Sequence, residues 1–159
     1  MAFYSAVDEV SREAANRFLA AQWGSTCMAV RGQLFDLSGV PGFAAWEDGQ
    51  IIALITYDVR GDVCEILSLD SLRENQGVGS TLLDFVVRLA RTRGCQKLTL
   101  VTTNDNTRAI RFYQKRGFDL SALDRDAVAR ARSLKPSIPM TGCDGIPIRH
   151  ELTFEMDVR

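Results

Sequence analysis

The spacing of hydrophobic residues changes several times along the chain, and each change predicts a different element. Apolar residues dominate two short runs, Phe43 to Trp46 and Ile51 to Val59, which predict strands. Between them, Asp48 and Gly49 are typical of a hairpin turn, because this dipeptide readily takes positive φ. A third run, Val63 to Asp70, predicts another strand. We therefore expect three antiparallel strands in succession.

A helical pattern follows these strands. A set of apolar residues falls on one helical face and predicts a helix that Gly94 ends: Val78, Leu82, Phe85, Val86 and Leu89. A strand over Lys97 to Thr103 comes next, and it should run parallel to the Val63 to Asp70 strand because a helix crosses between them. A second helix is expected over Asn106 to Arg116.

The remaining elements are predicted from weaker signals. They are strands over Phe3 to Val7, Phe118 to Leu120 and His150 to Val158, a helix over Ser11 to Trp23 with Ser11 as N-cap, and a polar helix over Asp124 to Leu134. The stretch from Trp23 to Phe35 has no clean periodicity and receives no assignment. Prolines and glycines from Pro136 to Pro147 predict a long loop. The segment from Asp124 to Pro147 is expected to form either a lid over the acceptor or a surface loop.

Length and charge narrow the function classes. With 159 residues the chain suits a single domain over 1–159. Its 19 Lys and Arg against 20 Asp and Glu give a net charge of −1, so no basic field would attract nucleic acid or an anionic membrane. No segment resembles a signal peptide or a membrane span, and we expect a cytoplasmic protein. The four cysteines are scattered and only one histidine, His150, accompanies them, which argues against a metal site and a disulfide framework.

The segment Gln76-Gly77-Val78-Gly79-Ser80 is the strongest functional signal, because it places a glycine turn between a predicted strand and a predicted helix. The first amides of a helix lack partners within the helix and carry partial positive charge, so they can bind a phosphate. A P-loop would need a Gly-Lys-Ser/Thr triplet, and a dinucleotide fingerprint would need a glycine where Leu82 stands. The spacing fits neither motif.

The turn resembles the Gln/Arg-x-x-Gly-x-Gly/Ala motif of the GCN5-related N-acetyltransferase (GNAT) superfamily. Glu74 takes the usual Gln or Arg position, so we expect its side chain to point to solvent while its backbone N–H binds. A second resemblance follows downstream, from Asn106 to Phe118, in the sequence NTRAIRFYQKRGF. The two motifs occur in the family's order, and the resemblance extends from about Phe43 to Phe118.

This resemblance implies an α/β fold with a mixed sheet: a central, mostly antiparallel twisted sheet with one splayed parallel strand pair, flanked by helices. It also implies acetyl-CoA as cosubstrate, no metal, and a homodimer among the expected assemblies. The pantetheine arm would pair with the strand at Ile66, Leu67 and Leu69. The turn would hold the pyrophosphate through Glu74, Asn75, Gln76, Gly77, Val78, Gly79 and Ser80.

The second motif implies the acid of an acyl transfer. Tyr113 stands where the family keeps its general acid, and a phenol with a pKa of roughly 10 can protonate a leaving thiolate; packing beside Phe112 is the alternative. Asn106 would bind the pantetheine arm, cap its helix, or do both. Tyr113 and Asn106 are therefore expected among the coenzyme contacts.

The general base is harder to assign from the sequence. Glu65 lies in an otherwise apolar strand, where burial would raise its pKa, and Glu151 comes second. Each can instead be an exposed carboxylate or half of an ion pair. Together with Asp70 and Asp144, these residues suit a cationic amine acceptor.

Two functions remain at this point. One is an N-acetyltransferase that transfers the acetyl group of acetyl-CoA directly to a primary amine of a small molecule or peptide. The other is a non-catalytic acyl-CoA-binding module for sensing or assembly. Tyr113 and Asn106 favour the enzyme.

Overall fold

The computed structural model describes residues 2–159, and the chain forms two compact units. The first unit comprises residues 2–27, 36–98 and 158–159, and the second comprises residues 28–35 and 99–157. Each unit has its own strands and helices, and each is described by itself. The expected single domain over 1–159 stays a prediction.

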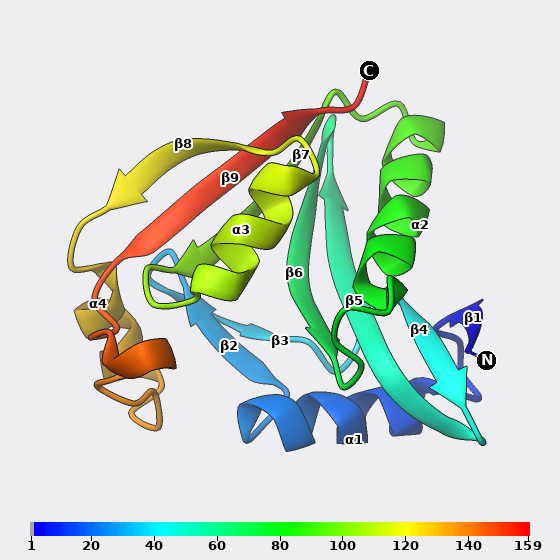
Figure 1. The fold of residues 1–159 in the computed structure, drawn as a ribbon, viewed down its shortest axis with the longest axis horizontal. Helices are drawn as coiled ribbons and strands as arrows, with labels where there is room; N and C mark the ends of the chain where they lie inside the picture. Colours follow the sequence, from blue (N-terminus) through cyan, green and yellow to red (C-terminus); the bar gives the residue numbers. More distant parts are fainter. Residues whose placement is uncertain (1) are drawn as a thin grey trace. The chain divides into compact units, whose positions relative to one another are not determined.

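The first unit contains an antiparallel sheet with the strand order β1-β4-β5-β6 (Figure 1). Its strands are β1 (Phe3–Ala6), β4 (Gly42–Glu47), β5 (Gln50–Arg60) and β6 (Val63–Ser71). Asp48 and Gly49 have φ values of 52° and 77° between β4 and β5. Both the hairpin and the succession of three antiparallel strands are confirmed.

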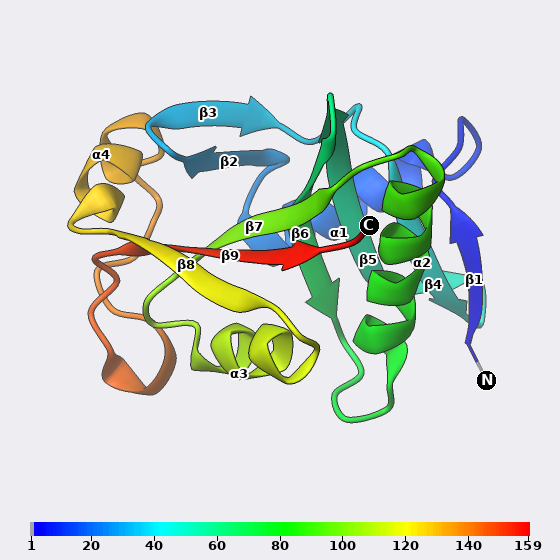
Figure 2. The ribbon, with the colours of Figure 1, turned by 90° about the horizontal axis from the view of Figure 1, so that it is seen from above.

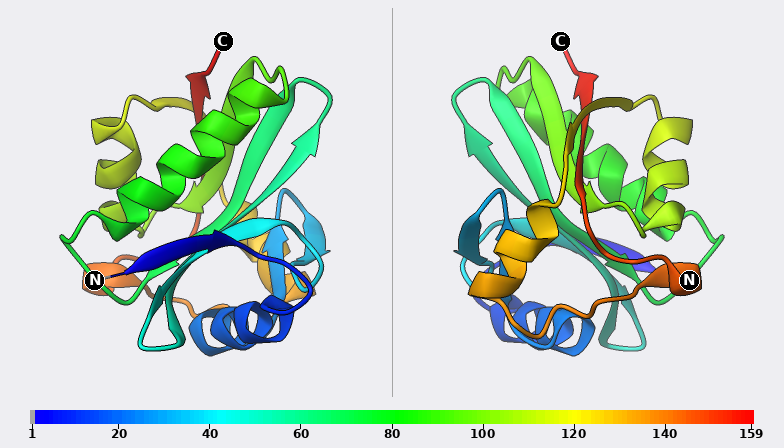
Figure 3. Two further views of the ribbon diagram at one scale, coloured as in Figure 1. Left: turned by 90° about the vertical axis from the view of Figure 1, so that its right-hand side faces the viewer. Right: turned by 90° about the vertical axis from the view of Figure 1, so that its left-hand side faces the viewer.

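Two helices cover opposite faces of this sheet (Figure 3), α1 (Arg12–Trp23) and α2 (Val78–Thr92). The apolar stripe of α2 packs on β4, β5 and β6, and its Phe85 ring stacks on Phe43 with centroids 5.4 Å apart. The helix α1 buries Ala15, Phe18 and Leu19. Apolar stripes therefore decide which face of each helix meets the sheet.

The predicted cap of α1 differs in detail from the observed one. Ser11 stands at the N-cap position, but its side chain makes no capping hydrogen bond to the helix. Instead the Ser11 hydroxyl and the Asp8 carboxylate bind each other's backbone amides, each at 2.9 Å. The predicted position of the helix start is confirmed, whereas the predicted side-chain cap is wrong, because Ser11 forms a turn with Asp8.

The strand β7 (Lys97–Thr103) begins in the first unit, beside the start of β6. The backbone amides of Gln96 and Lys97 donate to the Asp62 carbonyl at 2.7 and 3.4 Å. Because α2 crosses between them, β6 and β7 leave this point in the same direction. The parallel pair is confirmed.

The second unit contains the strand order β7-β9-β8, with β8 and β9 antiparallel (Figure 2). Its other elements are α3 (Thr107–Lys115), β8 (Asp119–Asp124), α4 (Ala127–Leu134), the short 3₁₀ turn η1 (Cys143–Gly145) and β9 (Glu151–Asp157). The two helices and two strands agree with the predicted elements within a few residues, whereas η1 lies in the predicted loop and was not expected. The side chains of Tyr113, Phe118 and Phe154 lie in its core.

The unassigned stretch after α1 forms a hairpin. Its strands are β2 (Cys27–Val30) and β3 (Gln33–Asp36), joined by Arg31 and Gly32 with φ values of 52° and 71°. Each strand has four residues, too few for a clear alternation of apolar and polar positions. Long-range contacts, described below, hold this hairpin in place.

Candidate functional site

The glycine turn between β6 and α2 presents backbone amides at the protein surface. Residues Glu74 to Gly77 are exposed, and Asn75 and Gly77 adopt positive φ values of 58° and 75°. In the described part of the chain, no backbone hydrogen bond outside the regular elements starts from the amides of Asn75 to Gly79. Because α2 begins at Val78, these amides lie at the positive end of its dipole. The turn can therefore bind an anion through its backbone.

The side chains around this turn leave it accessible. Glu74 is exposed, as predicted. The guanidinium of Arg73 pairs instead with Glu47 at 2.8 Å and holds the pKa of that carboxyl below its usual value. Gly77 has open space where a Cβ would stand. A phosphate placed at the turn would therefore meet backbone N–H groups.

The strand β6 carries a β-bulge at Leu67. Ser68 pairs with Thr56 and Ile66 with Tyr57, so Leu67 has no Cα partner in β5. A bulge leaves one residue outside the ladder and increases the local twist. Leu67 is buried and Leu69 is half-buried. The first unit thus joins the predicted donor-binding residues of β6 to the turn in one continuous segment.

Asn106 and Tyr113 belong to the second unit, where Tyr113 lies on α3 and Asn106 precedes its first residue. Asn106 is the N-cap, since its side chain accepts from the Ala109 amide at 3.2 Å and donates to Thr102 at 3.3 Å. Its predicted capping role is confirmed, and its contact with a pantetheine arm stays a prediction. Tyr113 is 6% exposed.

Aromatic rings fix the orientation of Tyr113. Phe112 and Phe118 meet its ring edge-on at 5.1 and 5.3 Å, and Phe154 lies at 6.5 Å. The packing against Phe112 that the sequence offered as an alternative is thus observed. It holds the phenol ring rigidly, which a proton donor also requires, so the acid role stays a prediction.

The two predicted base candidates have different surroundings. Glu65 on β6 is half-buried and stands opposite Asp58, so the deep burial that favoured it is absent. Glu151, at the start of β9, is 4% exposed. Its Oε1 accepts from the backbone amide of Arg31 at 3.0 Å, and burial raises the pKa of this carboxyl. Glu151 therefore fastens the β2–β3 hairpin, and a catalytic role for either residue stays a prediction.

A further carboxylate is that of Asp70, which the sequence suggested as one of several acidic residues suited to a cationic amine. No hydrogen-bond partner was predicted for it. Its Oδ2 accepts from the indole N–H of Trp23 at 2.7 Å, and burial raises the pKa of this carboxyl. The two residues are 47 positions apart. No local pattern marks such a pair, because packing of α1 on the sheet creates it.

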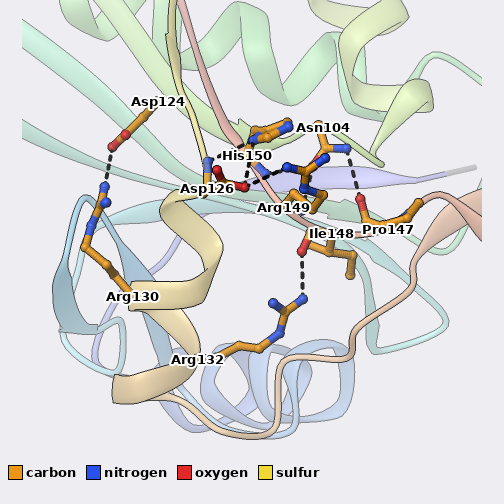
Figure 4. A network of polar contacts seen from close by, with 9 residues as sticks. All are labelled: Asn104, Asp124, Asp126, Arg130, Arg132, Pro147, Ile148, Arg149 and His150. Atoms are coloured by element: carbon orange, nitrogen blue, oxygen red, sulfur yellow. Dashed lines mark hydrogen bonds and ion pairs between the residues drawn. The ribbon is translucent and has the colours of Figure 1, made fainter.

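The loop after α4 is fastened by a polar network in the second unit. We call the nine residues of Figure 4 the second-unit network: Asn104, Asp124, Asp126, Arg130, Arg132, Pro147, Ile148, Arg149 and His150. The Arg132 guanidinium donates to the carbonyls of Pro139 and Ile148 at 2.8 and 2.7 Å. His150 accepts from the Asp126 amide through Nδ1 at 2.9 Å, which leaves the proton on Nε2 in the neutral ring.

Neither a metal site nor a membrane span is apparent in the described part of the chain. Within residues 2–159, no group of three or more His, Cys, Asp or Glu side chains could hold a metal ion. None of the helices there is both long enough and apolar enough to cross a membrane.

Comparison with known proteins supports the family suggested by the motifs. The model of the acetyltransferase (GNAT) family matches residues 8–118. The chain is 45% identical over 148 residues to the uncharacterized protein YdhI of Bacillus subtilis strain 168, covering 92% of each. An IAA acetyltransferase from Bacillus cereus ATCC 14579 has a similar fold, with a TM-score of 0.71, 19% identity and 99% of both chains covered.

A Bacillus subtilis acetyltransferase in complex with CoA is also similar, with a TM-score of 0.70, 17% identity and 99% of both chains covered. These structures confirm the predicted mixed α/β fold. The family match covers both predicted motifs, the glycine turn and the segment from Asn106 to Phe118. The chain therefore belongs to the GNAT family of acetyltransferases.

Proposed function

We propose that this protein is an N-acetyltransferase that transfers the acetyl group of acetyl-CoA to a primary amine of a small molecule or peptide. The observation that carries the proposal is the exposed glycine turn, whose amides from Asn75 to Gly79 have no backbone partner in the described chain. Such a turn fits a pyrophosphate. The structure of the similar Bacillus subtilis acetyltransferase contains CoA, which supports this ligand.

The backbone of β6 would hold the pantetheine arm and the thioester. Leu67 stands outside the ladder to β5, so its peptide group is not committed to that strand. A backbone N–H of this stretch facing the thioester oxygen would stabilise the charge that develops there. Leu67 and Leu69 are the donor-binding residues of this proposal.

Tyr113 would protonate the thiolate as coenzyme A leaves. Its ring is fixed by aromatic neighbours, so the phenol has a defined position. Replacing Tyr113 by Phe keeps the ring packing and removes only the hydroxyl. We expect turnover to fall by roughly 10²-fold or more, with coenzyme affinity nearly unchanged. Unchanged turnover would exclude Tyr113 as the acid.

Titration calorimetry with acetyl-CoA and CoA, followed by thiol release on addition of a panel of amines, tests the proposal. Binding together with amine-dependent thiol release is the expected result. Binding without release from any amine would favour the acyl-CoA-binding module instead. An absence of binding would contradict both functions and implicate Glu74 in weakening the turn.

A further inference from the structure

Asp70 is a carboxylate whose position is fixed by a residue from another element. It lies near the end of β6, opposite Leu54 of β5, and accepts from the Trp23 indole at 2.7 Å. Trp23 is the last residue of α1. Both side chains belong to the first unit and both are half-buried. Asp70 therefore combines a fixed geometry with partial access to solvent.

The face of β6 that carries Asp70 is polar within an apolar sheet. Ser68 precedes Asp70 by two residues and shares its face. The Ser68 hydroxyl lies 2.6 Å from that of Thr56, and both side chains are buried. A strand that only filled a core would place apolar groups at these positions. The polar face thus provides hydrogen-bonding groups beside the carboxylate.

Charged neighbours do not neutralise Asp70. The last turn of α1 contains no basic residue, and the β5 segment around Leu54, from Ile52 to Thr56, is uncharged. Arg73, three residues further along, pairs with Glu47. Burial raises the pKa of Asp70, and the indole hydrogen bond lowers it less. The carboxylate is consequently more basic than an exposed aspartate.

We propose that Asp70 is the general base of the acetyl transfer and recognises a cationic primary amine as acceptor; this inference rests on the proposed function. Trp23 is its positioning residue. Its N–H occupies only Oδ2, and Oδ1 has no hydrogen bond within residues 2–159. The ammonium group binds at the carboxylate and donates one proton to it.

The proton balance of the reaction is complete without a further reactant. The freed nitrogen bonds to the thioester carbonyl carbon, and the carbon–sulfur bond breaks. The leaving sulfur takes a proton from the general acid, and the second proton of the former ammonium group reprotonates that acid through solvent. The third proton stays on the amide nitrogen. The products are the N-acetyl amine, coenzyme A and one proton that Asp70 returns to solvent.

Asp70 fits this role better than the two carboxylates suggested by the sequence. Glu65 stands opposite another carboxylate, Asp58, and its charge contributes to raising the pKa of Arg60. Glu151 uses Oε1 to hold the Arg31 amide of a hairpin. Asp70 is therefore the accessible carboxylate, whereas Glu65 lies among charged residues and Glu151 makes a structural contact.

The decisive variant is Asp70→Asn, which keeps an oxygen for the Trp23 indole but cannot accept the ammonium proton. We expect CoA affinity within about twofold of wild type and turnover with aliphatic amines lower by roughly 10²-fold or more. The acidic limb of the kcat/KM pH profile should disappear. Turnover of this variant with an aromatic amine, which is already neutral at pH 7, should fall much less. Asp119→Asn, on the exposed strand β8, is the control and should match wild type.

Trp23→Phe separates positioning from catalysis. Removing the indole donor keeps the Asp70 carboxylate but removes the hydrogen bond that positions it and lowers its pKa. The acidic limb should therefore move to higher pH and persist, with a smaller loss of kcat than in Asp70→Asn. If Trp23 and Asp70 contribute to packing alone, Trp23→Phe should lower thermal stability and leave the kcat/KM pH profile unchanged.

Two results would overturn the inference in distinguishable ways. A folded Asp70→Asn variant with wild-type turnover and pH profile would remove Asp70 from the reaction and leave the proposed function intact. Wild-type protein that releases no thiol with any amine would contradict the proposed function itself and this inference with it.

Discussion

The glycine turn of the first unit and the loop region of the second unit use opposite means to order an irregular backbone. At the turn, residues Glu74 to Gly77 are exposed, and the amides from Asn75 to Gly79 have no backbone partner within the described residues. In the second-unit network, Arg132 and Asn104 bind backbone groups of the loop from a distance in sequence. A backbone site therefore depends on φ and on the absence of Cβ atoms, whereas a network depends on individual side chains and their fit.

The loop after α4 also packs closely against Asp105. A substitution that disturbs this contact should cause the largest loss of stability. The Cys143 amide donates to Asp105 Oδ2 at 3.2 Å, and a Cβ on Gly142 would collide with the same oxygen and lie 2.6 Å from Asp105 Cγ. We expect Gly142→Ala to lower the free energy of unfolding by roughly 1–3 kcal/mol, because a buried side chain must move.

Thermal or urea unfolding measures this loss. Gly39→Ala is the matched control, since a Cβ there meets nothing within 4 Å. Equal stabilities of the two variants would contradict the close fit of the loop against Asp105.

Gly77→Ala changes the backbone conformation of the glycine turn. It should lower stability less than Gly142→Ala does, but it should lower CoA affinity more. Gly77 has a φ of 75° with open space around it, so Ala there is strained by roughly 1–2 kcal/mol without any collision. Relief of that strain would reorient the amides, and we expect CoA affinity to fall by roughly tenfold.

Gly49→Ala provides the comparison for Gly77→Ala. Gly49 also has a positive φ, 77°, and open space, but it lies in the β4–β5 hairpin. Both variants should lose similar stability, and only Gly77→Ala should lose CoA affinity in calorimetric titration. A similar loss of CoA affinity in both variants would contradict a role of the turn in coenzyme binding.

The charge of Glu74 should modify binding without changing the fold. A carboxylate near a pyrophosphate is repulsive by up to about 1 kcal/mol in water, so Glu74→Gln should tighten CoA binding by up to about fivefold. The effect should diminish at high salt. Asp84→Asn, an exposed carboxylate further along α2, should bind CoA like the wild type. Weaker binding by Glu74→Gln would mean that the carboxylate itself contributes to the site.

The smallest effect concerns the pH dependence of the second unit. Burial raises the pKa of Glu151 above its unfolded value, so the folded chain binds more protons between the two values. Stability should therefore fall as pH rises through that window, which starts at about pH 4.3. Glu151→Gln keeps an oxygen for the Arg31 amide and should flatten this fall in unfolding experiments.

Asp36→Asn is the control of opposite sign for Glu151→Gln. The Ser38 amide lowers the pKa of Asp36, so its contribution to stability is lost as pH decreases, and the Asn variant should lose less stability on acidification. A steeper pH dependence of Glu151→Gln than of wild type would contradict the buried state of that carboxyl.

Local sequence signals predicted much of the fold and the glycine turn before α2. The Asp48-Gly49 turn, the apolar stripe of α2 and the Asn106 cap each depend on residues a few positions apart, and the structure confirms all three. The amides of the glycine turn depend only on a strand, glycines and a helix start. Backbone geometry follows from neighbouring residues, so these features are visible in sequence.

Tertiary packing decided the long-range hydrogen-bond partners of the buried and half-buried carboxylates Asp70, Asp105 and Glu151. Trp23 meets Asp70 across 47 positions, Arg31 meets Glu151 across 120, and Cys143 meets Asp105 across 38. Side-chain composition marks a residue as acidic, but its burial and its hydrogen-bond donors come from segments that only the folded chain brings together. The sequence by itself therefore determined the glycine turn and its helix start, and the tertiary structure decided which carboxylates are buried and which donors they bind.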